Sequence, residues 1–158
     1  AVRGIVAEGT LAAMDVEQRT ERWREVLESE GRTTFVAEEE HEGSPRVVGF
    51  ADGGTNRDTT PPYDAFTGEL RAIYVLDPHQ RGGTGTRLVC AVAAWLLEAG
   101  YRSMVVWTLE ASPFRAFYEH LGGLQVGCRD VVIDGTPYAS VAYGWNDLAA
   151  LRRRLGGS

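Results

Sequence analysis

The chain has 158 residues, 44% of them of apolar types, which is enough for one domain with its own core and too few for two. A formal charge of -6 and a pI near 5.1 argue against nucleic acids and anionic membranes as partners, and favour a cationic or amine-bearing partner through long-range attraction. The two cysteines form no pattern typical of a metal site or a disulfide framework, and no segment resembles a signal peptide or a membrane span, so we expect a cytoplasmic protein.

The first predicted element is a helix over residues 15–30. Asp15 can cap its N-terminus, apolar residues such as Trp23 and Val26 fall on one side, and Gly31 can end it. Residues 1–31 are therefore predicted to be a helical N-terminal part.

Two strands and a polar loop are predicted next. The β-branched and aromatic residues in 32–39 and 46–51 favour strands, joined by a turn-rich segment. Residues 53–68 then form a long loop, a kind of segment that is often functional. Within it, Arg57 and Asp58 either touch a substrate or form a solvated pair, which is the commoner role for charged loop residues.

The centre of the chain is predicted to be a strand, a turn and a helix. Residues 69–76 are rich in types that favour strands. Over residues 84–99, the apolar residues recur at a spacing that places them on one helical face, namely Leu88, Val92, Trp95 and Leu96.

Glycines dominate the turn over residues 80–85, at Gly82, Gly83 and Gly85. Glycines let the backbone approach a ligand, and the first N–H groups of the following helix point outward at the positive end of its dipole. The turn is either an anion site for a phosphate or pyrophosphate, or a tight turn that binds nothing. It has neither the Gly-Lys-Ser/Thr ending of a Walker-type loop nor the Gly-x-Gly-x-x-Gly dinucleotide fingerprint.

The C-terminal part is predicted to add a strand, a helix, a hairpin and a final helix. Residues 103–109 form a continuous apolar run, and Ser112 with Pro113 is typical of a helix start. The hairpin turns at Asp134-Gly135, and a short helix covers residues 146–155. This order predicts an α/β fold, a mixed sheet with flanking helices.

Two motifs resemble the GNAT superfamily of N-acetyltransferases. Residues 80–85 (QRGGTG) resemble its Arg/Gln-x-x-Gly-x-Gly/Ala pyrophosphate loop, and residues 112–123 (SPFRAFYEHLGG) resemble its Asn-Pro-x-x-x-Phe-Tyr-Glu-x-x-Gly segment. The resemblance covers residues 32–145 and implies a GNAT-like acyl-CoA N-acyltransferase fold. In that fold a central, mostly antiparallel sheet is splayed at the cofactor site. The family's first strand has no apparent counterpart in this sequence.

The resemblance also implies a domain organisation. We expect one N-acetyltransferase domain over residues 1–155, in which the helical part is followed by a cofactor-binding core over 32–109 and a C-terminal helix and hairpin over 110–155. Residues 156–158 are expected to be a disordered tail.

Acetyl-CoA (coenzyme A) is the cosubstrate that the resemblance implies, with no metal. Two departures from the family pattern stand out. Ser112 replaces the usual Asn, and Gly82 replaces a basic residue whose charge Arg81 and Arg87 can supply. The implied cofactor-binding residues are Ile73, Tyr74, Val75, Gln80, Arg81, Gly82, Gly83, Thr84, Gly85, Thr86, Ser112 and Phe117.

The resemblance implies two catalytic residues. Tyr118 corresponds to the tyrosine that gives a proton to the leaving thiolate, unless it is a tyrosine buried for packing. Glu69 corresponds to the glutamate that accepts the proton of the amine, directly or through water, unless it is an exposed strand-end residue paired with Arg71. A strand period of two would place Glu69 on one face with Arg71, Ile73 and Val75.

The sequence therefore predicts an acetyl-CoA-dependent N-acetyltransferase. It would move an acetyl group to a primary amine of a small molecule or peptide, directly in a ternary complex. A non-catalytic acyl-CoA-binding module is the main alternative, and a nucleotide-phosphate binder is a third. A homodimer is possible through the terminal hairpin.

Overall fold

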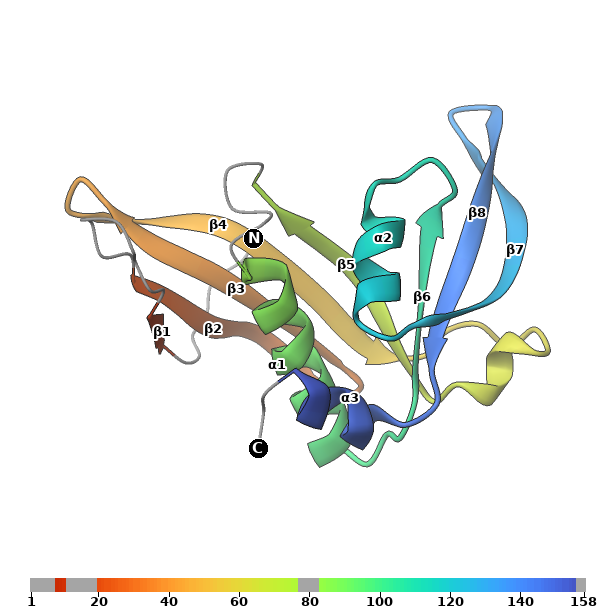
Figure 1. The fold of residues 1–158 in the computed structure, drawn as a ribbon, viewed down its shortest axis with the longest axis horizontal. Coiled ribbons are helices and arrows are strands. Elements are labelled where there is room, and N and C mark those ends of the chain that lie inside the picture. The colour runs from red at the N-terminus through yellow and green to blue at the C-terminus, as the bar shows by residue number, and fades with distance from the viewer. Residues whose placement is uncertain (1–7, 11–19, 77–82, 156–158) are drawn as a thin grey trace.

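A computed structural model describes residues 8–10, 20–76 and 83–155. These residues form one sheet of eight strands in the order β1-β2-β3-β4-β5-β6-β8-β7 (Figure 1). Only β5 and β6 pair in parallel within it, so the predicted mixed sheet is confirmed. The strands are β1 Glu8–Thr10, β2 Thr20–Ser29, β3 Arg32–His41, β4 Ser44–Thr55, β5 Gly68–Val75, β6 Met104–Leu109, β7 Leu124–Ile133 and β8 Thr136–Trp145.

The helices flank this sheet, with α1 across its centre. The described helices are α1 (Thr84–Glu98), α2 (Phe114–His120), α3 (Leu148–Arg154) and the short 3-10 helix η1 (Tyr63–Ala65). The predicted apolar face of α1 is confirmed, because Leu88, Val92 and Leu96 are fully buried in the core, where α1 packs against β3, β4 and β5. Each such side chain contributes roughly 1.5–3 kcal/mol of burial free energy. None of the helices in the described ranges is long and apolar enough to cross a membrane.

The predicted N-terminal helix is wrong for residues 20–29, which form β2. This strand makes a tight hairpin with β3, in which Ser29 lies opposite Arg32 and Gly31 has a φ of 76°. A β-bulge between Glu25 and Leu27 breaks the alternation of β2. Pairing with β3 outweighs the local helix propensity of this segment. The remaining positions of that predicted helix, 15–19, lie outside the described residues.

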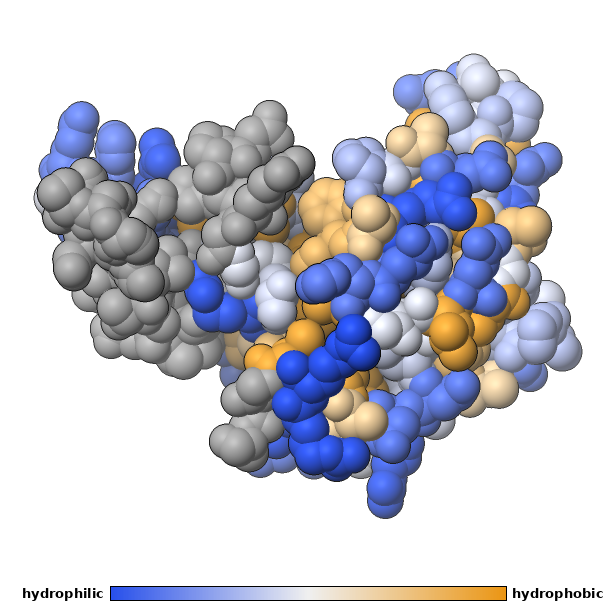
Figure 2. Space-filling model, in the orientation of Figure 1, coloured by the Kyte–Doolittle hydropathy of each residue, from blue (hydrophilic) through white to orange (hydrophobic). Residues whose placement is uncertain are grey.

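The C-terminal predictions are confirmed in detail. The Oγ of Ser112 accepts a hydrogen bond from the backbone N–H of Phe114 at 3.0 Å, and Pro113 has helical φ and ψ, so this pair starts α2 as expected. Asp134 and Gly135 both have positive φ and turn the chain between β7 and β8. The last helix is α3, and Figure 2 shows hydrophilic surface over it, in keeping with the arginines of its last turn. The expected tail, 156–158, lies outside the described residues.

The sheet is splayed between β5 and β6. The two strands pair only over three positions, from Gly68 opposite Met104 to Leu70 opposite Val106. Beyond these positions, described pairing joins β5 to β4 alone and β6 to β8 alone. Figure 1 shows the two strands diverging, with α2 over the space between them. The fold therefore leaves the facing edges of β5 and β6 unpaired with each other where they diverge.

Candidate active site

The N-terminus of α1 lies where β5 ends. Gly83 precedes the helix with a φ of 87°, a left-handed conformation that glycine adopts without strain. Gly85 is buried, and a Cβ at this position would lie 3.2 Å from the ring of Phe117. Glycine is thus needed here for close packing between α1 and α2. Of the other predicted loop residues, Gln80, Arg81 and Gly82 lie outside the described residues.

The first turn of α1 is suited to an anion. It contains no acidic residue, so no side chain within it opposes the positive end of the helix dipole. The guanidinium of Arg87 reaches back over Gly83, where its Nη1 lies 3.2 Å from the position of a Cβ. Thr84 is buried and Thr86 half-buried in the same turn. Arg87 thus places positive charge at the start of the helix, as expected from the replacement at Gly82.

A β-bulge at Arg71 interrupts β5. Along β4 the pairing advances by one residue, from Gly53 to Asp52, while along β5 it advances by two, from Leu70 to Ala72. One extra residue therefore lies on β5, and the faces to which successive side chains point change at the bulge.

The bulge corrects the predicted position of Glu69. Leu70 and Val75 belong to the core beneath α1, and Ile73 packs against it. Glu69, which precedes Leu70, points to the opposite face, where Tyr74 is 51% exposed. The expectation that Glu69 shares a face with Ile73 and Val75 is therefore wrong.

Tyr118 lies on α2 among aromatic rings. Its side chain is only 3% exposed, and its ring centroid lies 5.5 Å from that of Phe117, 6.0 Å from that of Tyr143 and 6.2 Å from that of Trp145. Its hydroxyl makes no hydrogen bond to any residue in the described ranges. Burial raises the pKa of this hydroxyl well above its usual value of about 10, so it stays protonated at neutral pH.

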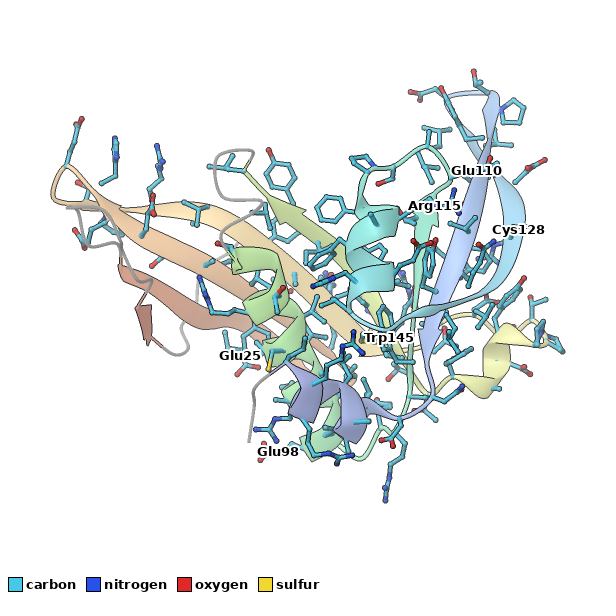
Figure 3. The ribbon with its side chains drawn as sticks, in the orientation of Figure 1. Glu25, Glu98, Glu110, Arg115, Cys128 and Trp145 are labelled. Atoms are coloured by element: carbon cyan, nitrogen blue, oxygen red, sulfur yellow. The ribbon has the colours of Figure 1, made fainter. Side chains whose placement is uncertain are left out.

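Side-chain hydrogen bonds hold α2 against β8. The hydroxyl of Tyr143 donates to Glu119 at 2.7 Å and accepts from Nε of Arg115 at 3.1 Å. Trp145 donates from Nε1 to the carbonyl of Leu121. Figure 3 shows Arg115 and Trp145 near opposite ends of α2. These bonds fix the orientation of the helix that carries Tyr118.

A cavity of about 370 Å³ lies beside the splay, a size typical of small-molecule sites. Its walls come from β5, β6, β7, β8 and the loop after β4. Tyr118 does not line it, so the cavity brings only one of the two predicted catalytic residues together with other polar groups. The lining residues are Arg57, Glu69, Leu70, Arg71, Trp107, Thr108, Leu109, Arg129, Val131 and Ser140.

Glu69 lines this cavity as a buried carboxylate, with 8% of its surface exposed. Arg57 donates to it from Nε at 3.0 Å, from Nη2 at 3.1 Å and from the backbone N–H at 3.2 Å, and this pairing raises the pKa of the guanidinium. Nε of Arg71 lies 3.9 Å from the same carboxylate. The interpretation of Glu69 as an exposed strand-end residue is therefore wrong.

The opposite wall of the cavity carries a second ion pair. Nη1 of Arg129 donates to Asp58 at 2.8 Å, and its guanidinium carbon lies 3.9 Å from the ring centroid of Trp107. The backbone N–H of Thr60 and the Arg129 guanidinium hold the pKa of Asp58 below its usual value. Arg57 and Asp58 each pair with a residue of another element and not with each other, and of the two only Arg57 is largely solvated, with 61% of its side chain exposed.

Asn56 fixes the loop that carries Arg57 and Asp58. Its Nδ2 donates to the carbonyls of Tyr63 and Phe66, both at 2.9 Å, and its Oδ1 accepts from the backbone N–H of Asp58. The long polar loop thus has a defined conformation that holds its two charged side chains at the cavity.

The cysteines and the acidic groups suggest no other chemistry. Burial raises the pKa of the Cys90 thiol, which makes it a weak nucleophile, and Cys128 is exposed on β7 (Figure 3). Among the described residues, no three His, Cys, Asp or Glu side chains are grouped as metal ligands.

Sequence reasoning missed most of the cavity. The sequence indicates Arg57 as a loop residue that either touches a substrate or belongs to a solvated pair, and Arg71 as a partner of Glu69. It indicates no site role for Trp107 or Arg129. These residues lie far apart in the sequence and belong to no motif. The sequence offers one signal for these contacts, namely opposite charges in the long loop, at Asp58, and in the terminal hairpin, at Arg129.

Comparison with known proteins agrees with this geometry. The sequence model described as the acetyltransferase (GNAT) family matches residues 7–123. The protein named uncharacterized N-acetyltransferase YuaI, from Bacillus subtilis (strain 168), is 40% identical over 121 residues, which is 77% of this chain. The match spans 66% of that relative, just under two thirds of its length.

Solved structures share the fold at lower identity. An N-acetyltransferase from Staphylococcus aureus Mu50 matches with a TM-score of 0.56 and 21% identity, over 74% of this chain and 68% of the other. A protein of Salmonella typhimurium solved with its cofactor acetyl-CoA matches with a TM-score of 0.55 and 18% identity, over 73% of this chain and 64% of the other. At these identities the likeness concerns the fold.

Proposed function

This chain belongs to the acetyltransferase (GNAT) family, and we propose that it transfers an acetyl group from acetyl-CoA to a primary amine of a small molecule or peptide. The observation that carries this proposal is the splay between β5 and β6. The N-terminus of α1 lies at the diverging end of β5, and a cavity with a buried carboxylate lies beside the splay. In this proposal, acetyl-CoA binds at the start of α1, the amine binds in the cavity, and the two meet at the splay.

The described residues fit acetyl-CoA. A helix start without acidic residues, the left-handed Gly83 and the nearby Arg87 guanidinium together favour a pyrophosphate. Gln80, Arg81 and Gly82 complete this loop in the proposal. When bound, acetyl-CoA supplies the acetyl thioester and its thiol leaving group.

The side of β5 that faces away from β4 is assigned to the reacting carbonyl and the pantetheine arm. Residues 73–75 pair with β4 on one side and lie beyond the three positions at which β5 pairs with β6. N–H groups held in a sheet need no reorganisation to stabilise a developing oxyanion. The roles of Ile73, Tyr74 and Val75 stay a prediction.

We assign Tyr118 as the general acid. Its hydroxyl is protonated at neutral pH, as any phenol with a pKa of about 10 or above is, and no described residue accepts its proton. The bonds between α2 and β8 hold it in place. A phenol can thus give a proton to a thiolate that leaves nearby.

We assign Glu69 as the general base. At neutral pH only on the order of one alkyl amine in a thousand is uncharged, so the reaction needs a group that takes up a proton. Glu69 reaches the cavity as a carboxylate held by Arg57. Since Arg57 occupies both carboxylate oxygens, proton transfer through a bridging water fits this geometry better than direct contact.

Transfer is proposed to be direct, within a ternary complex. The half-buried thiol of Cys90, with its raised pKa, is a poor candidate for an acetylated intermediate. We expect the protein in the reducing cytoplasm, where the free thiols Cys90 and Cys128 persist. The homodimer stays a prediction that the size of the protein in solution tests.

Two measurements test this proposal. The melting temperature should rise with saturating acetyl-CoA, since a ligand in hundredfold excess over its Kd stabilises the folded state by about 2.7 kcal/mol. Thiol should then be released from acetyl-CoA in the presence of a suitable amine from a panel. A raised melting temperature without thiol release from any amine would favour a non-catalytic acyl-CoA-binding module. An equal rise with ATP would favour a nucleotide-phosphate binder.

A further inference from the structure

The cavity has the opposite charge to the chain as a whole. Its lining contains three guanidinium groups, from Arg57, Arg71 and Arg129, against the carboxylate of Glu69, which also lines it, and that of Asp58, which pairs with Arg129. The whole chain has a net charge of -6. A concave surface with low-dielectric walls focuses the field of its charges, so this cavity attracts anions although the protein as a whole attracts cations.

The arginines keep donors that no described residue uses. Arg57 binds Glu69 through Nε and Nη2, which leaves Nη1. Among the described residues, Arg71 donates a hydrogen bond only from Nη2, to the backbone carbonyl of Thr55, and Arg129 only from Nη1, to Asp58. Guanidinium groups with spare N–H donors are the side chains best suited to bind the oxygens of an acid group.

Two donors at the cavity wall are buried without a partner. Nε of Arg71 and Nε1 of Trp107 make no hydrogen bond to any residue that the structure describes. An unpaired buried donor costs free energy until an acceptor reaches it. An amine brings further donors and cannot satisfy these groups, whereas a carboxylate or phosphonate brings acceptors.

The position of Glu69 completes a pattern for both charges of an amino acid. This carboxylate lies between two cations, 3.0 Å from Nε of Arg57 and 3.9 Å from Nε of Arg71. A primary amine at Glu69 would therefore place a nearby acid group beside a guanidinium. A simple amine at the same position would face three cations and the two carboxylates that pair with them, Glu69 and Asp58.

We propose that the acceptor carries an acid group close to its primary amine, as an amino acid does, and that Arg71 and Arg129 bind the acid group while Glu69 takes the amine. This inference rests on the proposed function and names the substrate class of the same site. A carboxylate and a phosphonate share the required chemistry, namely two or three acceptor oxygens with a negative charge.

Binding without turnover tests the inference independently of catalysis. With CoA present, calorimetry would measure the Kd of each protein amino acid, of its decarboxylated amine and of its aminophosphonate analogue. We expect at least one acid to bind about tenfold or more tightly than its decarboxylated amine. The Kd values of the amino acid and of its aminophosphonate analogue then show which acid group binds more tightly. If every amine binds as tightly as its acid, the inference is overturned.

Two variants identify the groups that bind the acid. Arg71→Gln and Arg129→Gln should each weaken binding of the preferred acid by about tenfold and leave binding of its amine unchanged. Arg153→Gln, at an exposed position on α3, is the matched control and should change neither. If Arg71→Gln fails to fold, Arg129→Gln still decides, because its side chain is 43% exposed. Equal binding of the acid by wild type and Arg129→Gln would contradict the assignment.

Turnover separates this inference from the proposed function. If the acid binds through the arginines but acetyl-CoA releases no thiol, the proposed function fails and the inference stands. If thiol is released faster with the decarboxylated amines than with the acids, the function stands and the inference fails.

Discussion

The two sides of the splay are made of different kinds of groups. At the start of α1, the contacts come from backbone and apolar rings, as where Gly85 packs against Phe117. In the cavity, charged side chains dominate, as where Arg57 binds Glu69 and Arg129 covers Trp107.

This difference separates two tasks. A site made of backbone groups depends on the relative position of two elements. It is therefore suited to a ligand that does not vary, and a substitution that moves either element disrupts it. A site made of side chains can change one residue at a time without moving the sheet. We therefore expect cofactor use to depend on the first side and acceptor choice on the second, and each variant below should affect only one of them.

The largest effect is expected at Tyr118. Tyr118→Phe removes a hydroxyl without a described hydrogen bond, so the melting temperature should stay unchanged while kcat falls by about a hundredfold or more. Tyr143→Phe is the matched control. It breaks the bonds to Arg115 and Glu119 that orient α2 but keeps the Tyr118 hydroxyl, so it should lower stability by about 1 kcal/mol and reduce kcat much less than Tyr118→Phe does. Full turnover in Tyr118→Phe would remove it as the general acid.

A smaller loss of activity is expected at Glu69. Glu69→Gln removes the proposed base, and kcat should fall by about a hundredfold. This is the low end of the usual contribution of a general base, because water can partly replace the carboxylate. The rise in melting temperature with acetyl-CoA should equal that of the wild type, because Glu69 lies on the acceptor side. A weakened response to acetyl-CoA would show that the two sides are not separate.

The α1 side is tested at Gly85. Gly85→Val adds atoms where a Cβ alone would lie 3.2 Å from Phe117, and should lower stability by about 1–3 kcal/mol and weaken acetyl-CoA binding. Adding Phe117→Leu should restore part of the melting temperature, because the smaller side chain relieves the clash. Additive losses in the double variant would show that Phe117 is not the cause.

The smallest effect is expected at Asp58, whose pKa is held below its usual value. A lowered carboxyl pKa contributes stability that is present above the unfolded pKa of about 3.9 and is lost as the pH falls through the folded value. Asp58→Asn should cost less than about 1 kcal/mol at pH 7, because its partner Arg129 is 43% exposed. Urea unfolding at neutral pH and near pH 3 gives the free energy of unfolding at each pH. The decrease in this free energy between the two should be smaller in Asp58→Asn than in the wild type. An equal decrease in the two proteins would mean that Asp58 does not contribute to the pH dependence of stability.

The sequence predicted the α1 side far better than the cavity, and the reason is physical. Helix caps, turn glycines and apolar periodicity act between near neighbours in the chain, so Ser112, Pro113 and Gly83 could be interpreted locally. The helix expected over residues 15–30 failed because a β-bulge and pairing with β3 outweighed its local pattern. The cavity depends on a second bulge at Arg71 and on contacts between distant elements, which no local pattern contains.

One measurement tests the central claim most directly. The protein would be incubated with acetyl-CoA that carries a deuterated acetyl group and with the amino acid that binds best, and both acceptor and protein would be examined by mass spectrometry. The account predicts a labelled acetyl group on the acceptor amine, one thiol released for each group transferred, and no label on the protein. Label on the protein, or thiol release without an acetylated acceptor, would contradict it.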